Sequence, residues 1–347
     1  MSLCDGMEIT MKIPISLIID DPTPVVNPFY LSAKSGTTSY EHARLRLETK
    51  DGRPLVKRFS KKLFLMFCDT IERWGIKGKF SVIPMPGNCG DIVNGIKDVE
   101  ESELREWIDI AKARIEGQFT LGPEMLTHNL AVDLKSGEAL SVNEHVWSQT
   151  QDRTTLTPYI KKALALLTEV GFDAFGVTSP WQFGISVEDE YAAAISKAVF
   201  EVTGKREAWY FLRGLRGVPN AKPWVQLEEE GRILVSIPAT TSDVIWQTMD
   251  TPETSDEYVS EIADLLITKD GKSGQIINVI NTGGYPILIA HWQSLMSNGL
   301  GTGIRVLDEV ARRVNENLSD KVEWMSFREI MELVIKNKAD YPKPDFK

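Results

Sequence analysis

Short apolar runs of strand length alternate with longer amphipathic segments along most of the chain. This alternation is typical of a parallel sheet whose strands are joined by covering helices. The expected fold class is therefore α/β. The pattern predicts eight strands, at Lys12–Asp20, Gly78–Pro84, Gln118–Thr127, Ala174–Thr178, Ala208–Leu212, Arg232–Ile237, Pro286–His291 and Val322–Met325.

The segments between these strands have the period of helices. They are Ser60–Trp74, Glu101–Ile115, Pro158–Val170, Val187–Val202, Ser255–Ile267, Ile304–Leu318 and Ser326–Ile335. Two starts carry capping signals: Thr157 offers an oxygen before Pro158, and Ser326 with Glu329 forms a capping box. We expect helices to begin at both places.

The chain shows no repeat, low-complexity tract or interdomain linker. Its 347 residues suit a single domain, 1–347, because barrels of alternating strands and helices reach this length with loop insertions. Two segments without a clear period, at about 22–55 and 129–156, each follow a predicted strand. In a barrel such connections lie on the catalytic face, so we expect them to shape a substrate site.

Composition narrows the partners and the compartment. The formal net charge is −10 and basic residues are scattered, which argues against a nucleic-acid partner. The apolar run Ile13–Ile19 is too short to span a bilayer, so no membrane span is expected. Cys4, Cys68 and Cys89 are odd in number and widely spaced, which indicates no disulfide framework and favours a cytoplasmic location.

Carboxylates and histidines end three of the predicted strands: Asp20 and Asp21 the first, His128 the third and His291 the seventh. Burying a carboxylate is costly unless it binds a cation or a hydrogen-bond network. Taken singly, the aspartates could cap the strand in an Asp-Pro turn, and each histidine could be structural. Their shared position at strand ends favours one common site.

The ordered motifs resemble those of the polysaccharide deacetylases, metal-dependent carbohydrate esterases. Asp20-Asp21 resembles the opening Asp-Asp motif of the family, and residues 124–128 resemble its Glu-Ile-Gly-Asn-His stretch. Residues 178–181 occupy the place of the Arg-Pro-Pro-Tyr segment, and residues 287–291 resemble the Leu-x-Leu-x-His motif. Over nearly the whole chain, the resemblance implies a distorted (β/α) barrel of seven or eight parallel strands.

The same resemblance implies a reaction. Asp20 would be the catalytic base and His291 the general acid, while Asp21 and His128 would bind a divalent metal, with zinc expected. Such a metal lowers the pKa of its water to roughly 7 and stabilises the oxyanion formed from an acyl carbonyl. The expected substrate is an acetylated carbohydrate, and His291 would protonate the departing sugar amine or alcohol.

The chain departs from the family pattern at three positions, the first of which is Pro22, where a glycine commonly follows the Asp-Asp motif. Val132 stands where the family has its second metal histidine, and Ser179 lies near the position of the family's arginine. A valine cannot bind a metal, so either another residue completes the site or this chain is a divergent branch with altered chemistry. The candidates are Asp133, Glu124 and His145, in that order.

Several further residues are expected to contact the substrate. Trp181 and Trp292 adjoin the proposed motifs, and sugar faces pack well on aromatic rings, although most aromatic residues serve the core. Glu124 and Ser179 are expected in the same groove. The resemblance places Leu288 beside the acetyl methyl group.

Two other functions stay open. A glycoside hydrolase on a related barrel would use Asp20 or Asp21 with Glu124 and no metal, at carboxyl separations of about 5 Å or about 6.5 to 9.5 Å. A barrel that binds carbohydrate without catalysis is the other alternative, favoured by Val132 at a ligand position.

Overall fold

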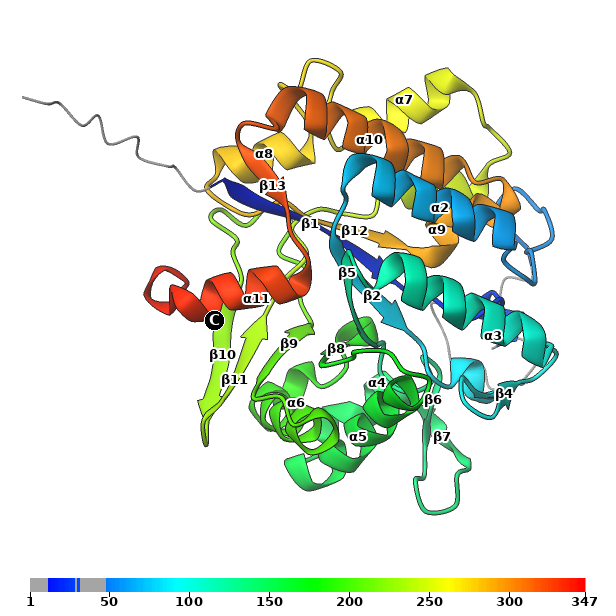
Figure 1. Ribbon diagram of the computed structural model, residues 1–347, viewed down its shortest axis with the longest axis vertical. Coiled ribbons are helices and arrows are strands. Elements are labelled where there is room, and N and C mark those ends of the chain that lie inside the picture. Colours follow the sequence, from blue (N-terminus) through cyan, green and yellow to red (C-terminus); the bar gives the residue numbers. More distant parts are fainter. Residues whose placement is uncertain (1–11, 29, 32–47, 347) are drawn as a thin grey trace, which may run out of the picture.

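In the part of the chain that the structure describes, eight parallel strands occupy the centre of the molecule, each within or close to a predicted range (Figure 1). The structure is a computed structural model that describes residues 12–28, 30–31 and 48–346. The α/β class with parallel strands is confirmed. The strands are β1 (Ile13–Asp20), β2 (Gly78–Val82), β5 (Phe119–Pro123), β8 (Gly176–Thr178), β9 (Glu207–Phe211), β11 (Arg232–Ser236), β12 (Ile287–His291) and β13 (Val322–Trp324).

These strands lie in two sheets. The first has the order β12-β1-β2-β5, with β13 also paired to β1, and the second has the order β10-β11-β9-β8. Strand β10 (Trp224–Glu229) is antiparallel to β11 and was not predicted. The sheets meet at a parallel bridge between Glu124 and Thr178 and where the Thr240 amide donates to the Ile287 carbonyl, at 2.9 Å. The two sheets are thus in contact at both of these places.

Strand register brings the predicted site residues to one end of the molecule. Asp20 lies directly beside His291 because β1 and β12 are parallel neighbours. Glu124 directly follows β5, and Thr178 ends β8 beside it. Since parallel strands share the direction of their carboxyl ends, these polar side chains gather at the same rim.

Helices cover both sheets (Figure 1). The predicted ones are α2 (Lys61–Trp74), α3 (Glu101–Ile110), α5 (Arg153–Glu169), α6 (Glu188–Thr203), α7 (Asp256–Asp264), α10 (Thr302–Leu318) and α11 (Phe327–Lys336). The helices α2, α3 and α10 lie along the first sheet, α5 and α6 lie beside the second, and α11 contacts strands of both. One hydrophobic cluster contains Ile18 of β1 and Trp209 of β9, so the two sheets share a core.

The expected start of α5 is wrong. This helix begins at Arg153, where Asp152 is the N-cap and accepts a hydrogen bond from the Thr155 amide at 2.9 Å. Pro158 therefore lies inside the helix, and the Thr157 hydroxyl donates to the Arg153 carbonyl at 2.7 Å instead of capping. A polar residue before a proline was a plausible cap, but an earlier aspartate supplied a better one.

The start of α11 agrees with the prediction. Ser326 is the N-cap, its hydroxyl accepts from the Glu329 amide, and the Glu329 carboxylate accepts from the Ser326 amide at 2.7 Å. Both halves of the capping box are present.

The second insertion builds a hairpin and short helices that were not predicted. The hairpin pairs β6 (Leu130–Val132) with β7 (Ala139–Asn143), and α4 (Glu144–Trp147) follows directly. Short elements that pack on the rim lack the long periodicity that identifies core strands and helices. Elsewhere α8 (Gln275–Asn281) and α9 (Trp292–Met296) were missed because they too are short.

Parts of the chain lie outside the described residues. They include Cys4 and, in the first insertion, residues 29 and 32–47. Cys68 is a buried free thiol, and the Cys89 thiol donates to the Gly87 carbonyl. Within the described ranges, no helix combines the length and apolar character needed to cross a membrane.

Candidate metal centre and active site

The two adjacent aspartates point to different partners at the end of β1. Both are buried, each about 5% exposed. Asp20 ends the strand, and Asp21 has a φ of 62°, in the left-handed region, so the chain turns sharply after the strand. This turn lets Asp20 pair with Lys79 while Asp21 reaches His128.

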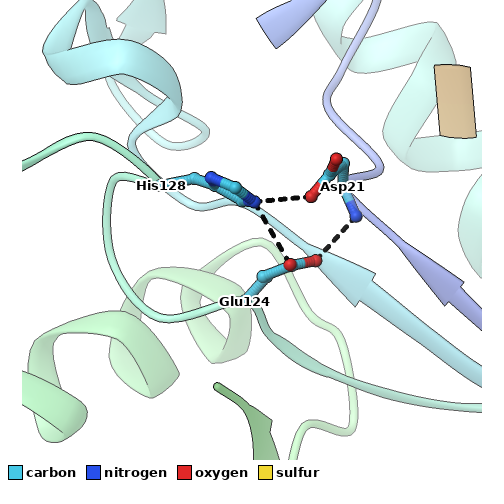
Figure 2. Close-up of side chains that lie close together, drawn as sticks. All are labelled: Asp21, Glu124 and His128. Carbon is cyan, nitrogen blue, oxygen red and sulfur yellow. Dashed lines mark hydrogen bonds and ion pairs between the residues drawn. The ribbon is translucent and has the colours of Figure 1, made fainter. Parts of the chain in front are cut away.

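Asp21, Glu124 and His128 form a buried cluster (Figure 2). The Nε2 atom of His128 lies 2.6 Å from Asp21 Oδ1 and 3.3 Å from Glu124 Oε1. The Asp21 amide donates to Glu124 Oε2 at 2.6 Å. This hydrogen bond holds one oxygen of Glu124 and directs the other towards His128.

The cluster fits a divalent cation. One ligand atom from each residue lies within 4.8 Å of the others. Asp21 Oδ1 is buried, and the polar atom beside it is His128 Nε2, at 2.6 Å. Buried acceptors need a donor or a cation, and two carboxylates with one imidazole are ligands that divalent metals accept. The metal implied by the resemblance therefore has a suitable set of residues.

Burial and charge shift the pKa values of this cluster in different directions. Burial, followed by the charges of Asp20 and Asp21, raises the pKa of Glu124 to about 8. Burial would also raise the pKa of Asp21, but the charge of His128 holds it well below its usual range. Burial opposes the charge on His128, yet Asp21 raises its pKa well above the ordinary value. A proton on His128 thus balances the carboxylates, and a cation would have to displace it.

Asp20 is held by a fully buried lysine. Lys79, on β2, forms an ion pair with Asp20. Its Nζ also donates to Ser81 Oγ and to Thr178 Oγ1, at 2.6 Å each. Lys79 was not identified from the sequence, although a lysine inside a predicted apolar strand indicates a buried partner of opposite charge.

His291 is oriented by Asp243, which the sequence analysis did not identify. Asp243 Oδ2 lies 2.8 Å from His291 Nδ1 and also accepts from the His291 amide at 3.1 Å. Burial opposes the charged imidazole, but the bond to Asp243 and the charge of Asp21 raise the pKa of His291 to about 10. Trp246 packs edge-on to the imidazole, with ring centroids 5.1 Å apart. Asp243 lies in a loop after β11, where no local pattern marks it.

The side chain of Trp181 is exposed and lies beside the Asp21, Glu124 and His128 cluster. Its side chain is 42% exposed, and its ring lies edge-on to His128, with centroids 3.9 Å apart. Trp181 has a φ of 43°, so its backbone adopts a conformation that bulky residues rarely take. The strained turn places an aromatic face at the mouth of the candidate site.

The structure corrects the first choice of a third metal ligand. Asp133 lies in the turn after β6, where its carboxylate accepts from the Lys135 amide at 3.0 Å and from the Ser136 hydroxyl at 3.1 Å. In the described part of the chain, the one group of potential ligands contains Glu124 and neither Asp133 nor His145. A short hairpin separates Asp133 from the rim, and this could not be deduced from sequence spacing.

Three expected substrate contacts are also corrected. Trp292 is fully buried, and its ring is surrounded edge-on by phenylalanines, with Phe64 at a centroid distance of 5.4 Å. Leu288 is buried on the opposite face of β12 from His291, whereas Ile289 shares the face of His291. The Ser179 hydroxyl is buried against Tyr191, at 2.9 Å, and does not reach the cluster.

Three solved structures are similar to this chain at low sequence identity. A protein from Mycobacterium smegmatis described as a polysaccharide deacetylase superimposes with a TM-score of 0.55 at 13% identity, covering 100% of this chain and 96% of that one. The Xyl-CE4 domain of a multidomain xylanase from the hindgut metagenome of Trinervitermes trinervoides gives 0.39 at 11% identity, with coverage of 97% and 96%. A peptidoglycan deacetylase from Bacillus subtilis gives 0.40 at 9% identity, with 95% of each chain covered.

The first of these superpositions shows that the chain has a polysaccharide-deacetylase-like fold with a strongly divergent sequence. No family model matches the sequence. No curated protein matches it either.

Proposed function

We propose that this protein is a metal-dependent hydrolase that removes an acyl group from a carbohydrate. The observation that carries the proposal is the convergence of Asp21, Glu124 and His128 at the rim of a deacetylase-like fold. Asp20 and His291, the residues proposed for proton transfer, are paired across neighbouring strands at the same rim.

The chain supplies a residue for each task of such a reaction. A divalent cation held by the Asp21 cluster would act as a Lewis acid towards an acyl carbonyl and would make water more acidic. Asp20, oriented by Lys79, would accept the proton of the attacking water. His291, held by Asp243, would donate a proton to the departing oxygen or nitrogen of the sugar.

The exposed ring of Trp181 supports a carbohydrate substrate. Sugar rings present C–H groups that pack on aromatic faces, and this ring stands next to His128. Glu124 is assigned here as a metal ligand rather than as a substrate contact.

A glycoside hydrolase fits the geometry less well. The raised pKa of Glu124 beside the ionised Asp21 would suit an acid and nucleophile pair. However, His128 Nε2 lies within 2.6 Å and 3.3 Å of these two carboxylates, in the space that a glycosidic bond would need.

Metal analysis of matched variants tests the proposal. We expect the wild type to bind one divalent ion. Loss of a residue that only supports a ligand lowers metal affinity by roughly 10- to 100-fold. Because Glu124 is proposed as a direct ligand, Glu124→Gln should lower the affinity by more than this. Asp133→Asn is the control, because it removes an equivalent charge from a residue outside the cluster. Equal losses in both variants, or no metal in the wild type, would overturn the proposed site.

Activity then separates binding from proton transfer. His128→Ala should abolish metal content and hydrolysis of acetylated sugar analogues, whereas His291→Ala should abolish hydrolysis and keep the metal. Full activity in the presence of a chelator would instead favour a glycoside hydrolase. Sugar binding without metal or turnover would favour the non-catalytic barrel.

A further inference from the structure

The segment that carries His128 has an unusual backbone. After β5 the chain passes through Met125, with a φ of 45°, and through His128, with a φ of 53°. Residues with side chains are disfavoured in this left-handed region, at a cost of about 1 to 2 kcal/mol each. Surrounding contacts must therefore hold residues 125–128 in place.

One carboxylate provides three of these contacts, beside backbone hydrogen bonds from Met125, Met85 and Gly87. Glu144, fully buried at the start of α4, accepts from three successive backbone amides. Its Oε2 accepts from Leu126 at 3.3 Å and from Thr127 at 3.1 Å, and its Oε1 accepts from His128 at 2.7 Å. The Glu144 amide also donates to the Asn129 carbonyl at 2.8 Å.

A tyrosine also binds this carboxylate. The Tyr159 hydroxyl, on α5, donates to Glu144 Oε2 at 2.9 Å. Tyr159 is buried and packs against Trp147, with ring centroids 4.7 Å apart. The carboxylate is thus joined to a long helix, and its four hydrogen bonds compensate its burial.

We infer that Glu144 is a positioning residue that holds the His128 loop so that Nε2 faces Asp21 and Glu124. The inference rests on the proposed metal site. Val132 stands where the resembled family has a second metal histidine. The inference explains how the His128 imidazole stays directed at the carboxylates of Asp21 and Glu124 in this chain. Val132 itself is buried in the hairpin that leads to Glu144.

Glu144→Gln tests this role. Glutamine has one carbonyl oxygen, so its NH2 group would face backbone amides that need an acceptor. Supporting residues of metal sites typically contribute about 10- to 100-fold to metal affinity, and we expect a loss of that size in calorimetric titrations of the full chain with Zn²⁺ or Mn²⁺. Tyr159→Phe keeps the three amide bonds and should give a smaller loss.

Glu188 offers a matched control. Its carboxylate accepts from the Tyr210 hydroxyl at 2.7 Å and pairs with Arg213, away from the cluster. Glu188→Gln therefore removes a comparable carboxylate with a tyrosine partner, and should leave metal affinity unchanged. Equal losses of metal affinity in Glu144→Gln and Glu188→Gln would contradict the inference, because they would show that Glu144 has only a general structural role.

A second measurement does not depend on metal. In the metal-free protein, Glu144→Gln should accelerate amide hydrogen exchange at Leu126, Thr127 and His128 but not in β2. Faster exchange supports the inference even if the wild type binds no cation, a result that would defeat only the proposed function. Unchanged exchange would overturn the inference. If Glu144→Gln does not fold, Tyr159→Phe, which removes one of the four hydrogen bonds of the carboxylate, should give a smaller acceleration at the same three amides, and no acceleration there would overturn the inference.

Discussion

His291 shows how one distant residue can set the chemistry of a side chain. The bond to Asp243 opposes the effect of burial and, with the charge of Asp21, raises the pKa of the imidazole to about 10. The same carboxylate binds the His291 backbone amide, so it fixes the residue as well as its proton. A histidine that holds its proton at neutral pH is suited to act as a general acid.

Asp243→Asn should lower the pKa of His291, because burial then acts with less opposition. NMR titration of the imidazole in chelator-treated protein measures this change. Since the folded-state pKa is above the unfolded value, the stabilisation that Asp243 provides is complete below pH 6.5, roughly, and declines as the pH rises through about 10.

Urea denaturation of wild type and Asp243→Asn at several pH values checks the sign. The difference in unfolding free energy should be largest at the acidic end of that window and smallest above it. A difference that grows with pH, or an unchanged His291 titration, would show that Asp243 does not control this proton.

Among the elements, the start of α11 was read correctly from four residues. The capping box is local, so its signal does not depend on the rest of the fold. Helix α11 contacts strands of both sheets, which makes its first turn relevant to the stability of the core. The start of α5 was misread because two polar residues competed as caps and the sequence did not rank them.

Ser326→Ala should lower the free energy of unfolding by about 1 kcal/mol, because the Glu329 amide loses its acceptor. Urea denaturation measures this loss. Ser326→Thr keeps a capping oxygen and should retain most of the stability. Equal stability of the alanine and wild-type proteins would mean that tertiary packing alone defines the start of this helix.

On the scale of the whole molecule, Lys79 links the two sheets. It pairs with Asp20 on β1 and donates to Thr178 on β8, near the bridge where the sheets meet. Breaking a buried ion pair leaves an uncompensated charge, which makes the interaction structural as well as chemical.

Lys79→Met should destabilise the protein by about 3 to 5 kcal/mol, since it leaves the Asp20 carboxylate buried without its cation. The double variant with Asp20→Asn should recover a large part of this loss. Denaturant unfolding of both single variants and the double variant gives the coupling energy. Simple additivity of the two losses would contradict a direct interaction.

Sequence periodicity was sufficient for the parallel strands of the two sheets but not for the antiparallel strand β10. The eight parallel strands in the described residues lie where apolar runs predicted them, because strands covered by helices are largely apolar. The rim elements β6, β7 and α4 were missed, since short, partly exposed segments carry no such pattern.

The local sequence also determined which residue types could act: carboxylates and histidines at strand ends. Only the tertiary structure decided which of them meet. It brought Glu124 rather than Asp133 to His128, buried Trp292 among phenylalanines, and added Asp243, Lys79 and Glu144. The physical reason is that a site depends on distances between segments far apart in the chain, whereas periodicity reports only what neighbouring residues share.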